Sequence, residues 1–410
     1  MGTNWENHLS TMARGRLSAS LLGDLFAVEN EYKPICLSPG EPTQDLFPLE
    51  ELRPFFEAVC DNPSLFGYYA YHAGHKGLRE WICNWMHDDG VAAAWVKPDH
   101  LMLTTGSQQG LGLASELLID EGTVVALEAP TYIEALRAFR KCGARFVEVA
   151  MDDDGILPES FEEVCRIHRP PILYTIPNFQ NPSGAVTSLE RRKGILEVAR
   201  KYDVVILEDD PYRYISFMER VPASYMSLAG DDDRVIYLGS FSKLICPGIR
   251  CGWMILPQAI LKKMTQLRHT LEISLPAPLQ EVVSGFVHQM NRTSYFSRLQ
   301  GIYRGRCQAL VSNLEKTMVP RGLSMNSPRG GYFLWTHLPG IEDMRQFAEF
   351  AIREHGVSVT PGYIFYTEAG QGADTLRFSY AKVSEEMAEE GCRRLAAAYD
   401  AYTERTGERR

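Results

Sequence analysis

The sequence lacks the features that would place the protein in a membrane or on a nucleic acid. No run reaches the roughly 18 apolar residues that a membrane-spanning helix needs. Acidic residues outnumber basic ones, 52 to 42, and the net charge of −10 argues against a general nucleic-acid binder. Residues 1–20 contain no apolar signal-peptide core. We therefore expect a cytoplasmic protein without a membrane or nucleic-acid partner.

Paired cysteines and clustered metal ligands are also missing. The nine cysteines are scattered and form no C-x-x-C pair, a pattern typical of reduced, buried thiols. His72 and His75 are close in sequence, but no further ligand lies near them, so we expect no metal site. The function we expect therefore depends neither on disulfides nor on a metal.

What the sequence does have is 410 residues of ordinary globular composition, enough for one large core and a second, smaller one. Between residues 100 and 238, β-prone apolar runs alternate with helical periodicity, which predicts a mostly parallel sheet of the seven-stranded type between helices. After about residue 275, long helical stretches, one over 279–311, enclose short strands, which predicts an α+β domain. We expect three parts: an N-terminal segment (1–45) packed on the small domain and active site, a large domain (46–278) and a small domain (279–410).

Ligands of such α/β sheets bind beyond the carboxyl ends of the strands, and candidate phosphate ligands occur there in this sequence. Gly106 follows an apolar run, and Ser107 opens a helical stretch. The free N–H groups of the first helical turn, the helix dipole and the Ser107 hydroxyl together suit a phosphate. Many strand-to-helix turns look similar, so this loop alone is compatible with an ordinary turn.

A second loop, after the run 235–238, contains two hydroxyls, a lysine and an arginine: Ser240, Ser242, Lys243 and Arg250. Pro and Gly at 247 and 248 favour a turn that brings Arg250 back toward the two serines. Hydroxyls and a guanidinium hold a phosphate by charge-assisted hydrogen bonds. A lysine beside that phosphate, in a partly desolvated pocket, is neutral enough to attack an aldehyde.

A third strand end presents three acids in a row, Glu208, Asp209 and Asp210, followed by Tyr212. Buried carboxylates are costly without partners, and one of them placed against a pyridine nitrogen keeps that nitrogen protonated. Tyr212, and Asn181 in an Asn-Pro-Ser-Gly turn after another strand, are suited to hydrogen-bond a ring phenolate. A phosphate cup, an imine-forming lysine, an acid and phenolate donors are together the requirements of pyridoxal 5′-phosphate (PLP).

Specific motifs make the sequence recognisable. It resembles the fold-type I PLP-dependent enzymes of aminotransferase class I/II, and it is most similar to the 2-aminoadipate and kynurenine aminotransferase-like subgroup. The resemblance covers roughly residues 35–400. It rests on Ser-Pro-Gly-Glu-Pro (38–42) with Leu-Phe-Pro (46–48), Thr-Gly-Ser-Gln-Gln-Gly (105–110), Pro-Thr-Tyr (130–132), Asn-Pro-Ser-Gly (181–184), Glu-Asp-Asp-Pro-Tyr (208–212), Ser-Phe-Ser-Lys (240–243), Pro-Gly-Ile-Arg-Cys-Gly (247–252) and Leu-Arg-Phe-Ser-Tyr (376–380).

The resemblance implies a role for each matching residue toward the cofactor. Lys243 holds PLP as an imine and then transfers the substrate proton, and Asp209, three residues before Tyr212, pairs with the ring nitrogen. Asn181 and Tyr212 hold the ring oxygen. The remaining implied ligands are a stacking tyrosine and the phosphate-binding residues, namely Tyr132, Ser107, Gln108, Ser240, Ser242 and Arg250.

The resemblance also implies a substrate end and a partner. Arg377 binds the substrate α-carboxylate, with Gly40 and Asn181 close to the same end. Tyr69 matches a tyrosine that reaches the phosphate of the neighbouring subunit, which implies a homodimer with shared active sites. The sequence departs from the family at Pro39, where glycine is usual, and at Tyr332, where a flexible apolar residue is common.

We predict an aminotransferase that moves an amino group between an L-amino acid and a 2-oxo acid. The alternative is other PLP chemistry on an amino-acid-derived substrate: carbon–sulfur cleavage, elimination or cyclisation like that of aminocyclopropane-carboxylate synthase, or oxidation. A third reading is a non-catalytic ligand sensor. Four aromatic residues expected near the pocket favour an aromatic or 2-aminoadipate-like substrate: Tyr32, Tyr332, Phe365 and Tyr366.

Overall fold

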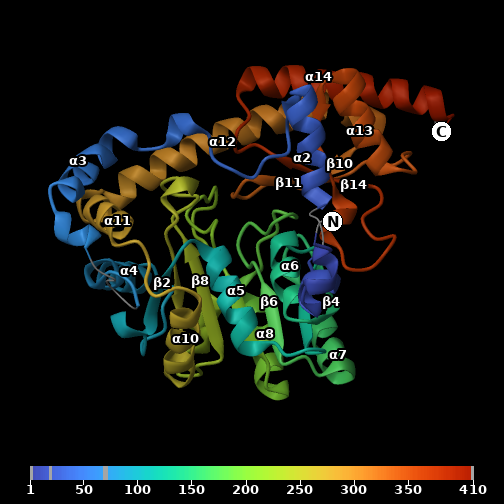
Figure 1. Cartoon of the computed structure of the whole chain (residues 1–410). Helices are drawn as coiled ribbons and strands as arrows, with labels where there is room; N and C mark the ends of the chain where they lie inside the picture. The colour runs from blue at the N-terminus through green and yellow to red at the C-terminus, as the bar shows by residue number, and fades with distance from the viewer. Residues whose placement is uncertain (1–2, 18–20, 68–72, 408–410) are drawn as a thin grey trace.

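The computed structural model describes residues 3–17, 21–67 and 73–407, and its main feature is a large sheet of eight strands (Figure 1). Five neighbouring strands are parallel, β9 runs antiparallel to its neighbours β2 and β8, and the two-residue β5 is an antiparallel edge. The predicted mostly parallel sheet is therefore confirmed, with β5 as an addition to its seven longer strands. The order is β2 (Leu101–Thr104), β9 (Gly252–Ile255), β8 (Val235–Ser240), β7 (Val205–Asp209), β6 (Ile172–Thr175), β3 (Val124–Ala129), β4 (Arg145–Asp152) and β5 (Gly155–Ile156).

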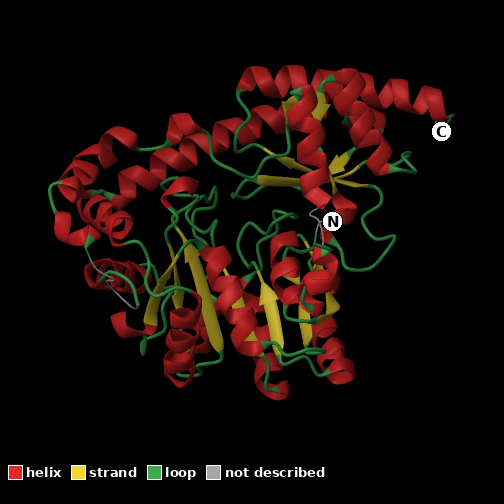
Figure 2. Cartoon of the chain, in the orientation of Figure 1, coloured by secondary structure: helices red, strands yellow, loops and turns green. Residues whose placement is uncertain are grey.

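The helices of this part of the chain pack around the sheet (Figure 2). Strands β2, β6 and β8 are buried along their whole length, which explains why their sequences are continuous apolar runs rather than alternating ones. The helix after β6 begins where the Ser188 hydroxyl accepts from the Arg191 N–H. The helices are α4 (Lys76–Asp88), α5 (Ser107–Leu118), α6 (Ile133–Lys141), α7 (Pro158–His168), α8 (Leu189–Tyr202), α9 (Tyr225–Ala229) and α10 (Gln258–Leu271).

The last third of the chain builds a second, antiparallel sheet with the order β10 (Ser324–Met325), β11 (Phe333–His337), β14 (Thr375–Ser379) and β13 (Thr360–Pro361). The helices of this last third of the chain are α11 (Ala277–Gln289), α12 (Arg292–Thr317), α13 (Met344–His355) and α14 (Glu385–Thr406). The single helix expected over 279–311 is wrong, because Asn291 ends one helix and caps the next by accepting from the Ser294 N–H.

The two main hydrophobic cores correspond to the two larger sheets, and α12 contributes to both: Tyr295, Leu299 and Tyr303 pack in the first, and Cys307, Leu310 and Leu314 in the second. The buried side chains of α11 belong to the first core. The predicted domain boundaries at 45 and 278 stay a prediction.

The N-terminal part of the chain contacts the second sheet's unit through two of its elements. It contains α1 (Thr11–Gly15), α2 (Leu21–Tyr32), β1 (Ile35–Cys36) and, further on, α3 (Leu49–Cys60). Strand β1 pairs in parallel with β12 (Val357–Ser358), and α2 packs against α13. This pairing leads the chain directly toward Gly40. No helix in the described part of the chain is long and apolar enough to cross a membrane.

Candidate active site

A cavity of about 360 Å³ lies beyond the ends of the strands of the large sheet. Residues of both sheets and of the segment after β1 line it. Twelve of the thirteen residues predicted from the sequence are among them: Gly40, Ser107, Gln108, Tyr132, Asn181, Asp209, Tyr212, Ser240, Ser242, Lys243, Arg250 and Arg377. The thirteenth, Tyr69, falls outside the described residues.

Lys243 follows β8, and its side chain ends in the interior of the cavity. Its Nζ donates to the Gly40 carbonyl at 2.8 Å and lies 5.9 Å from the centre of the Tyr212 ring. Burial lowers the pKa of Lys243 to about 8, against an opposing effect of the Glu41 carboxylate. A lysine with a pKa this close to neutrality readily gives up its proton, and the free amine is the form that attacks a carbonyl carbon.

Asp209 is the last residue of β7, and its two carboxylate oxygens differ in their surroundings. Tyr174 donates to Oδ2 at 3.0 Å, whereas the buried Oδ1 has no hydrogen-bond partner among the described residues. Burial raises the pKa of Asp209 to about 7, while the Tyr174 hydroxyl opposes that rise. A protonated ring nitrogen placed at Oδ1 would supply the missing partner and keep the carboxylate charged, so the site fits the ring of PLP.

The three consecutive acids, residues 208–210, have different surroundings. Glu208 accepts from the first N–H groups of α9, those of Tyr225 and Met226, at 3.0 Å each. Asp210 accepts from Asn178 at 2.8 Å and pairs with Arg213 at 3.6 Å. Both acids are therefore occupied by structural partners, and Asp209 alone of the three lines the cavity.

The loops proposed to hold a phosphate meet at Gly106, which precedes α5. Gly106 has a φ of 85°, and an added Cβ would come within 2.8 Å of Arg250 Nη2. Arg250 itself has a φ of 47° after the 3₁₀ turn η5 (Pro247–Ile249) and donates to the Thr105 carbonyl. The turn therefore returns Arg250 to the N-terminal end of α5, and the Ser242 N–H donates to Ser240 Oγ at 3.1 Å in the same cup.

Asn181 and Tyr212 both line the cavity, and each has a side chain that can donate a hydrogen bond. Asn181 Oδ1 accepts from Arg377 Nη1 at 2.9 Å, so the amide nitrogen is the group left to donate to a ligand. Burial raises the pKa of both Tyr132 and Tyr212, so each tyrosine keeps its hydroxyl proton at neutral pH. The Tyr212 hydroxyl and the Asn181 amide are therefore suitable donors for a phenolate oxygen.

A buried glutamate holds the loop that carries Asn181. Glu128, at the end of β3, accepts from Thr175 Oγ1 at 2.6 Å, from the Ile176 N–H at 3.1 Å and from Gln180 Nε2 at 3.0 Å. Burial raises the pKa of Glu128 to about 7 despite these donors. The loop is thus tied to the sheet one residue before Asn181.

Arg377 lies in β14, far from the large sheet in sequence. Its guanidinium carbon is 4.5 Å from the centre of the Phe333 ring and 4.8 Å from that of Phe365. Nη2 donates to the Ser38 carbonyl at 3.1 Å, and the buried Nε has no partner among the described residues. Burial lowers the pKa of Arg377 to about 10, so the group remains a cation at neutral pH and suits a carboxylate.

Sequence reasoning missed three features of the site. Tyr174 was one, although its position was readable in principle: it pairs with Leu207 across β6 and β7, and Asp209 lies two residues further on the same face. Glu41, beside Gly40, lines the cavity and pairs with Lys382 at 2.7 Å. Glu134, after Tyr132, also lines it.

Two of the four aromatic residues expected near the pocket lie just behind its lining. The ring centre of Tyr332 is 5.7 Å from Lys243 Nζ, and that of Phe365 is 4.8 Å from the Arg377 guanidinium carbon. Tyr32, Tyr332, Phe365 and Tyr366 do not line the cavity; its aromatic residues are Tyr132, Tyr212 and Phe333. Tyr332 is fully buried and donates toward the Lys243 carbonyl at 3.1 Å, which explains a tyrosine where the family has an apolar residue. Tyr32 instead accepts from Arg353 at 2.7 Å on the surface.

Comparison with known proteins indicates the same kind of enzyme as the residues of the cavity. The family aminotransferase class I and II matches residues 33–395. The chain belongs to this family. It is 34% identical to the 2-aminoadipate transaminase of Thermus thermophilus (94% of each chain covered) and 31% identical to aromatic-amino-acid aminotransferase 1 of Thermococcus litoralis (96% and 94%). Pyrococcus horikoshii kynurenine aminotransferase, solved with pyridoxamine phosphate (PMP), has a TM-score of 0.91 at 30% identity, with 97% and 98% covered.

Family membership confirms the subgroup, the fold and the activity predicted from the sequence. The chain is a PLP-dependent aminotransferase, and the alternative lyase, cyclase or oxidase chemistry is not favoured. Which residues perform each role, which amino acids are accepted and how the chain assembles are separate questions.

Proposed function

We propose that this aminotransferase uses Lys243 as the cofactor lysine and proton carrier, on L-amino acids with aromatic or 2-aminoadipate-like side chains. The observation that carries the proposal is that two groups in one cavity have pKa values shifted in opposite directions. The pKa of Lys243 is lowered to about 8, and that of Asp209 is raised to about 7. Such perturbed groups in a concave site are typical of acid–base chemistry.

When bound, PLP supplies an aldehyde carbon that accepts the amino group and a protonated ring that withdraws electrons. Asp209 Oδ1 keeps the ring nitrogen protonated, while Ser107, Ser240 and Arg250 bind the phosphate. Asn181 and Tyr212 donate to the ring oxygen. Tyr132 packs on the ring face, and Gln108, Ser242 and the first turn of α5 complete the phosphate cup.

The substrate end requires a cation and a mobile proton. Arg377 binds the α-carboxylate through Nε and its neighbouring Nη, which orients the Cα–H bond. Lys243 Nζ, in the interior of the cavity, would carry the Cα proton. Gly40 leaves room there, because a Cβ at this position would come within 2.6 Å of the Phe333 ring.

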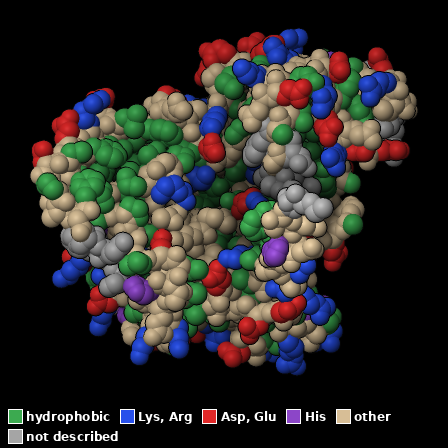
Figure 3. Space-filling view, viewed as in Figure 1, with side chains coloured by type: hydrophobic (Ala, Val, Ile, Leu, Met, Phe, Trp, Pro, Cys, Tyr) green, Lys and Arg blue, Asp and Glu red, His purple; other side chains and the backbone are tan. Residues whose placement is uncertain are grey.

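A homodimer is the assembly we propose, with Tyr69 reaching the partner's phosphate. Supporting it are exposed apolar side chains just before residue 68: Leu49 and Phe56 on α3, and Phe66 in the turn η3 (Pro63–Phe66), are 56%, 40% and 62% exposed. Figure 3 shows apolar surface gathered over α3 and α11. A contiguous patch of this kind on a globular protein favours association.

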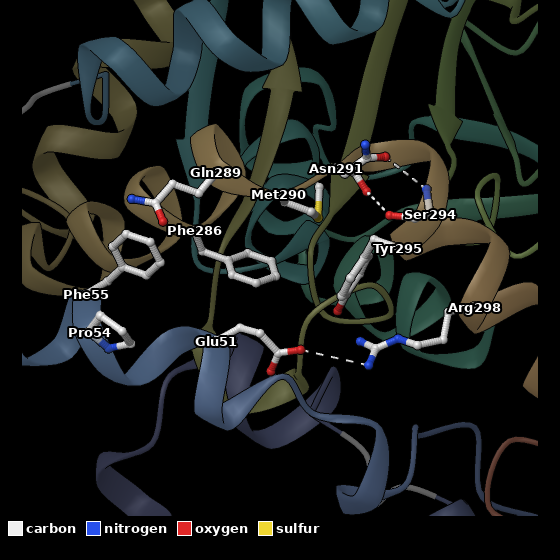
Figure 4. A pocket seen from close by; sticks show the side chains of 10 residues that line it. All are labelled: Glu51, Pro54, Phe55, Phe286, Gln289, Met290, Asn291, Ser294, Tyr295 and Arg298. Carbon is white, nitrogen blue, oxygen red and sulfur yellow. Dashed lines mark hydrogen bonds and ion pairs between the residues drawn. The ribbon is translucent and has the colours of Figure 1, made fainter.

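A hollow beside that patch adds to the argument. About 550 Å³ in volume, it lies between α3 and the α11–α12 junction and includes Phe55, Phe286 and Met290, with Glu51 and Arg298 3.8 Å apart at one side (Figure 4).

Light scattering after gel filtration tests the dimer, and mixing inactive Lys243→Ala with Tyr69→Phe chains tests shared sites by regained activity. A cytoplasmic location stays a prediction for cell fractionation.

The activity itself is tested by a half-reaction. Holoenzyme mixed with an L-amino acid and no oxo acid is expected to convert its cofactor stoichiometrically to pyridoxamine phosphate, followed by absorbance. Release of ammonia or thiol with the cofactor unchanged would contradict transamination.

A further inference from the structure

The charges that line the cavity distinguish between the two substrate classes proposed above. Among the described lining residues three are cationic, Lys243, Arg250 and Arg377, and three are acidic, namely Asp209, Glu41 and Glu134. In the proposed function every cation already has a partner: the aldehyde, the phosphate and the α-carboxylate. Asp209 is likewise assigned to the ring nitrogen. What remains for the substrate side chain is two carboxylates.

The cations that neutralise these two carboxylates lie behind them. Lys382 contacts Glu41 at 2.7 Å, and Arg137 contacts Glu134 at 2.9 Å, but neither cation is part of the described lining. Of each ion pair, the acidic member is therefore the one that lines the cavity. The surroundings of Lys243 agree, because Glu41 raises the pKa of its ammonium more strongly than Lys382 lowers it.

The rest of the described lining is neutral. Apolar and aromatic surface comes from Ile176, Phe333, Tyr132 and Tyr212. Apart from the three cations already assigned to the cofactor and the α-carboxylate, no described lining residue carries positive charge. A second carboxylate on the substrate would enter without a partner and face Glu41 or Glu134 across a partly desolvated space. Like charges placed together in this way are a general device for rejecting a competing ligand.

We infer that Glu41 is a specificity-determining residue that disfavours dicarboxylic substrates, so the enzyme prefers amino acids with neutral, in particular aromatic, or cationic side chains. The inference rests on the proposed function, because it assigns the α-carboxylate to Arg377. It extends to the acceptor, since both half-reactions use one pocket: a neutral 2-oxo acid is preferred over 2-oxoglutarate.

The test compares pairs of amino acids in which only one member carries a side-chain carboxylate, and glutamine and glutamate are isosteric. Holoenzyme is mixed with L-glutamine or L-glutamate, and with L-phenylalanine or 4-carboxy-L-phenylalanine, and the rate of cofactor conversion is followed by absorbance without an oxo acid. The amide and the unsubstituted ring are expected to react faster than their acidic counterparts. Titration of the visible spectrum with glutaramate and glutarate, which do not react, is expected to show the same order in Kd.

Two substitutions assign the effect to Glu41. Glu41→Gln keeps the shape and frees Lys382, so the glutamine-to-glutamate rate ratio falls about two- to fivefold, the range typical of an exposed charge interaction. Lys382→Gln leaves Glu41 unneutralised, so the ratio rises by a similar factor. A purely structural contact between the N-terminal segment and the small sheet would instead slow both substrates alike in both variants. Glu163→Gln, which removes an ion pair of similar length on α7, is the matched control and leaves the ratio unchanged.

The outcomes are distinguishable. If glutamate reacts as fast as glutamine, or if the ratio is the same in the wild type and Glu41→Gln, the selectivity is overturned while the aminotransferase activity stands. If no amino acid of either charge converts the cofactor, the proposed function fails and the selectivity fails with it.

Discussion

The cavity has two halves that are assembled in different ways. The cofactor half comes from the last residues of strands of one sheet and the loops that follow them, and Asp209, Ser240 and Ser242 there are all at least nine-tenths buried. The substrate half joins segments that are far apart: Arg377 bonds to Ser38, and Lys243 to Gly40, 339 and 203 residues away. Glu41, its outermost part, has a side chain that is 64% exposed. A local motif therefore specifies the first half, and tertiary packing specifies the second.

Removing Lys243 should have the largest effect, because it empties the centre that both halves share. In Lys243→Ala we expect the visible band of the lysine-bound cofactor to vanish and turnover to fall by about 10⁴-fold, the upper range for loss of a positioned acid–base group. Absorbance and steady-state rates measure this. The exposed Lys262→Ala on α10 is the control, and full turnover in Lys243→Ala would refute the assignment.

Within the cofactor half, Asp209 and its neighbour Asp210 should separate chemistry from stability. Asp209→Asn removes the charge at the ring nitrogen, and we expect a loss of about 10²–10³ in kcat, as for other preorganised electrostatic groups. Asp210→Asn instead breaks a buried pair with Arg213, which should lower the melting temperature more than the rate. The reverse pattern would mean that Asp210 is the ring partner.

In the substrate half, Arg377→Lys should change binding but leave the cofactor in place. A lysine cannot reproduce the forked contact, so KM for the amino acid is expected to rise about 10- to 100-fold, the range for a lost hydrogen bond to a charged group. The visible spectrum of the holoenzyme stays that of the wild type. Arg393→Lys on α14 serves as a surface control. Loss of the visible spectrum of the holoenzyme with an unchanged KM would mean that Arg377 binds the cofactor rather than the substrate.

The same division explains what could be read from the sequence. Ser107, Lys243 and Asp209 were predictable because each follows an apolar strand within a few residues, and the carboxyl ends of parallel strands meet at one edge. The junction at Asn291 was missed because helical periodicity continues through a cap. Phe333 and Glu41 were missed because their neighbours depend on how the second sheet is placed, and no local pattern encodes that placement.

Tyr174 offers the finest test of the cofactor half, because its hydroxyl donates to Asp209 Oδ2. Its hydroxyl stabilises the anion and so lowers the pKa of Asp209 against the effect of burial. Binding of the cofactor ring should weaken as pH falls through about 7, where Asp209 gains a proton. In Tyr174→Phe the anion loses that donor, so the midpoint should move upward by about 0.5–1 pH unit, the equivalent of one hydrogen bond.

The measurement needs a ligand that does not report on Lys243. The phosphate of 4′-deoxypyridoxine has no aldehyde, so its Kd between pH 5.5 and 8.5, followed by fluorescence, depends on the ring and phosphate contacts alone. Phe139→Leu, which alters the ring packed edge-on against Tyr174 at 5.4 Å but keeps its hydroxyl, controls for a packing change. Because the hydroxyl bonds to Oδ2 and leaves Oδ1 open, an unchanged midpoint in Tyr174→Phe would mean that the ring contacts do not depend on the charge of Asp209.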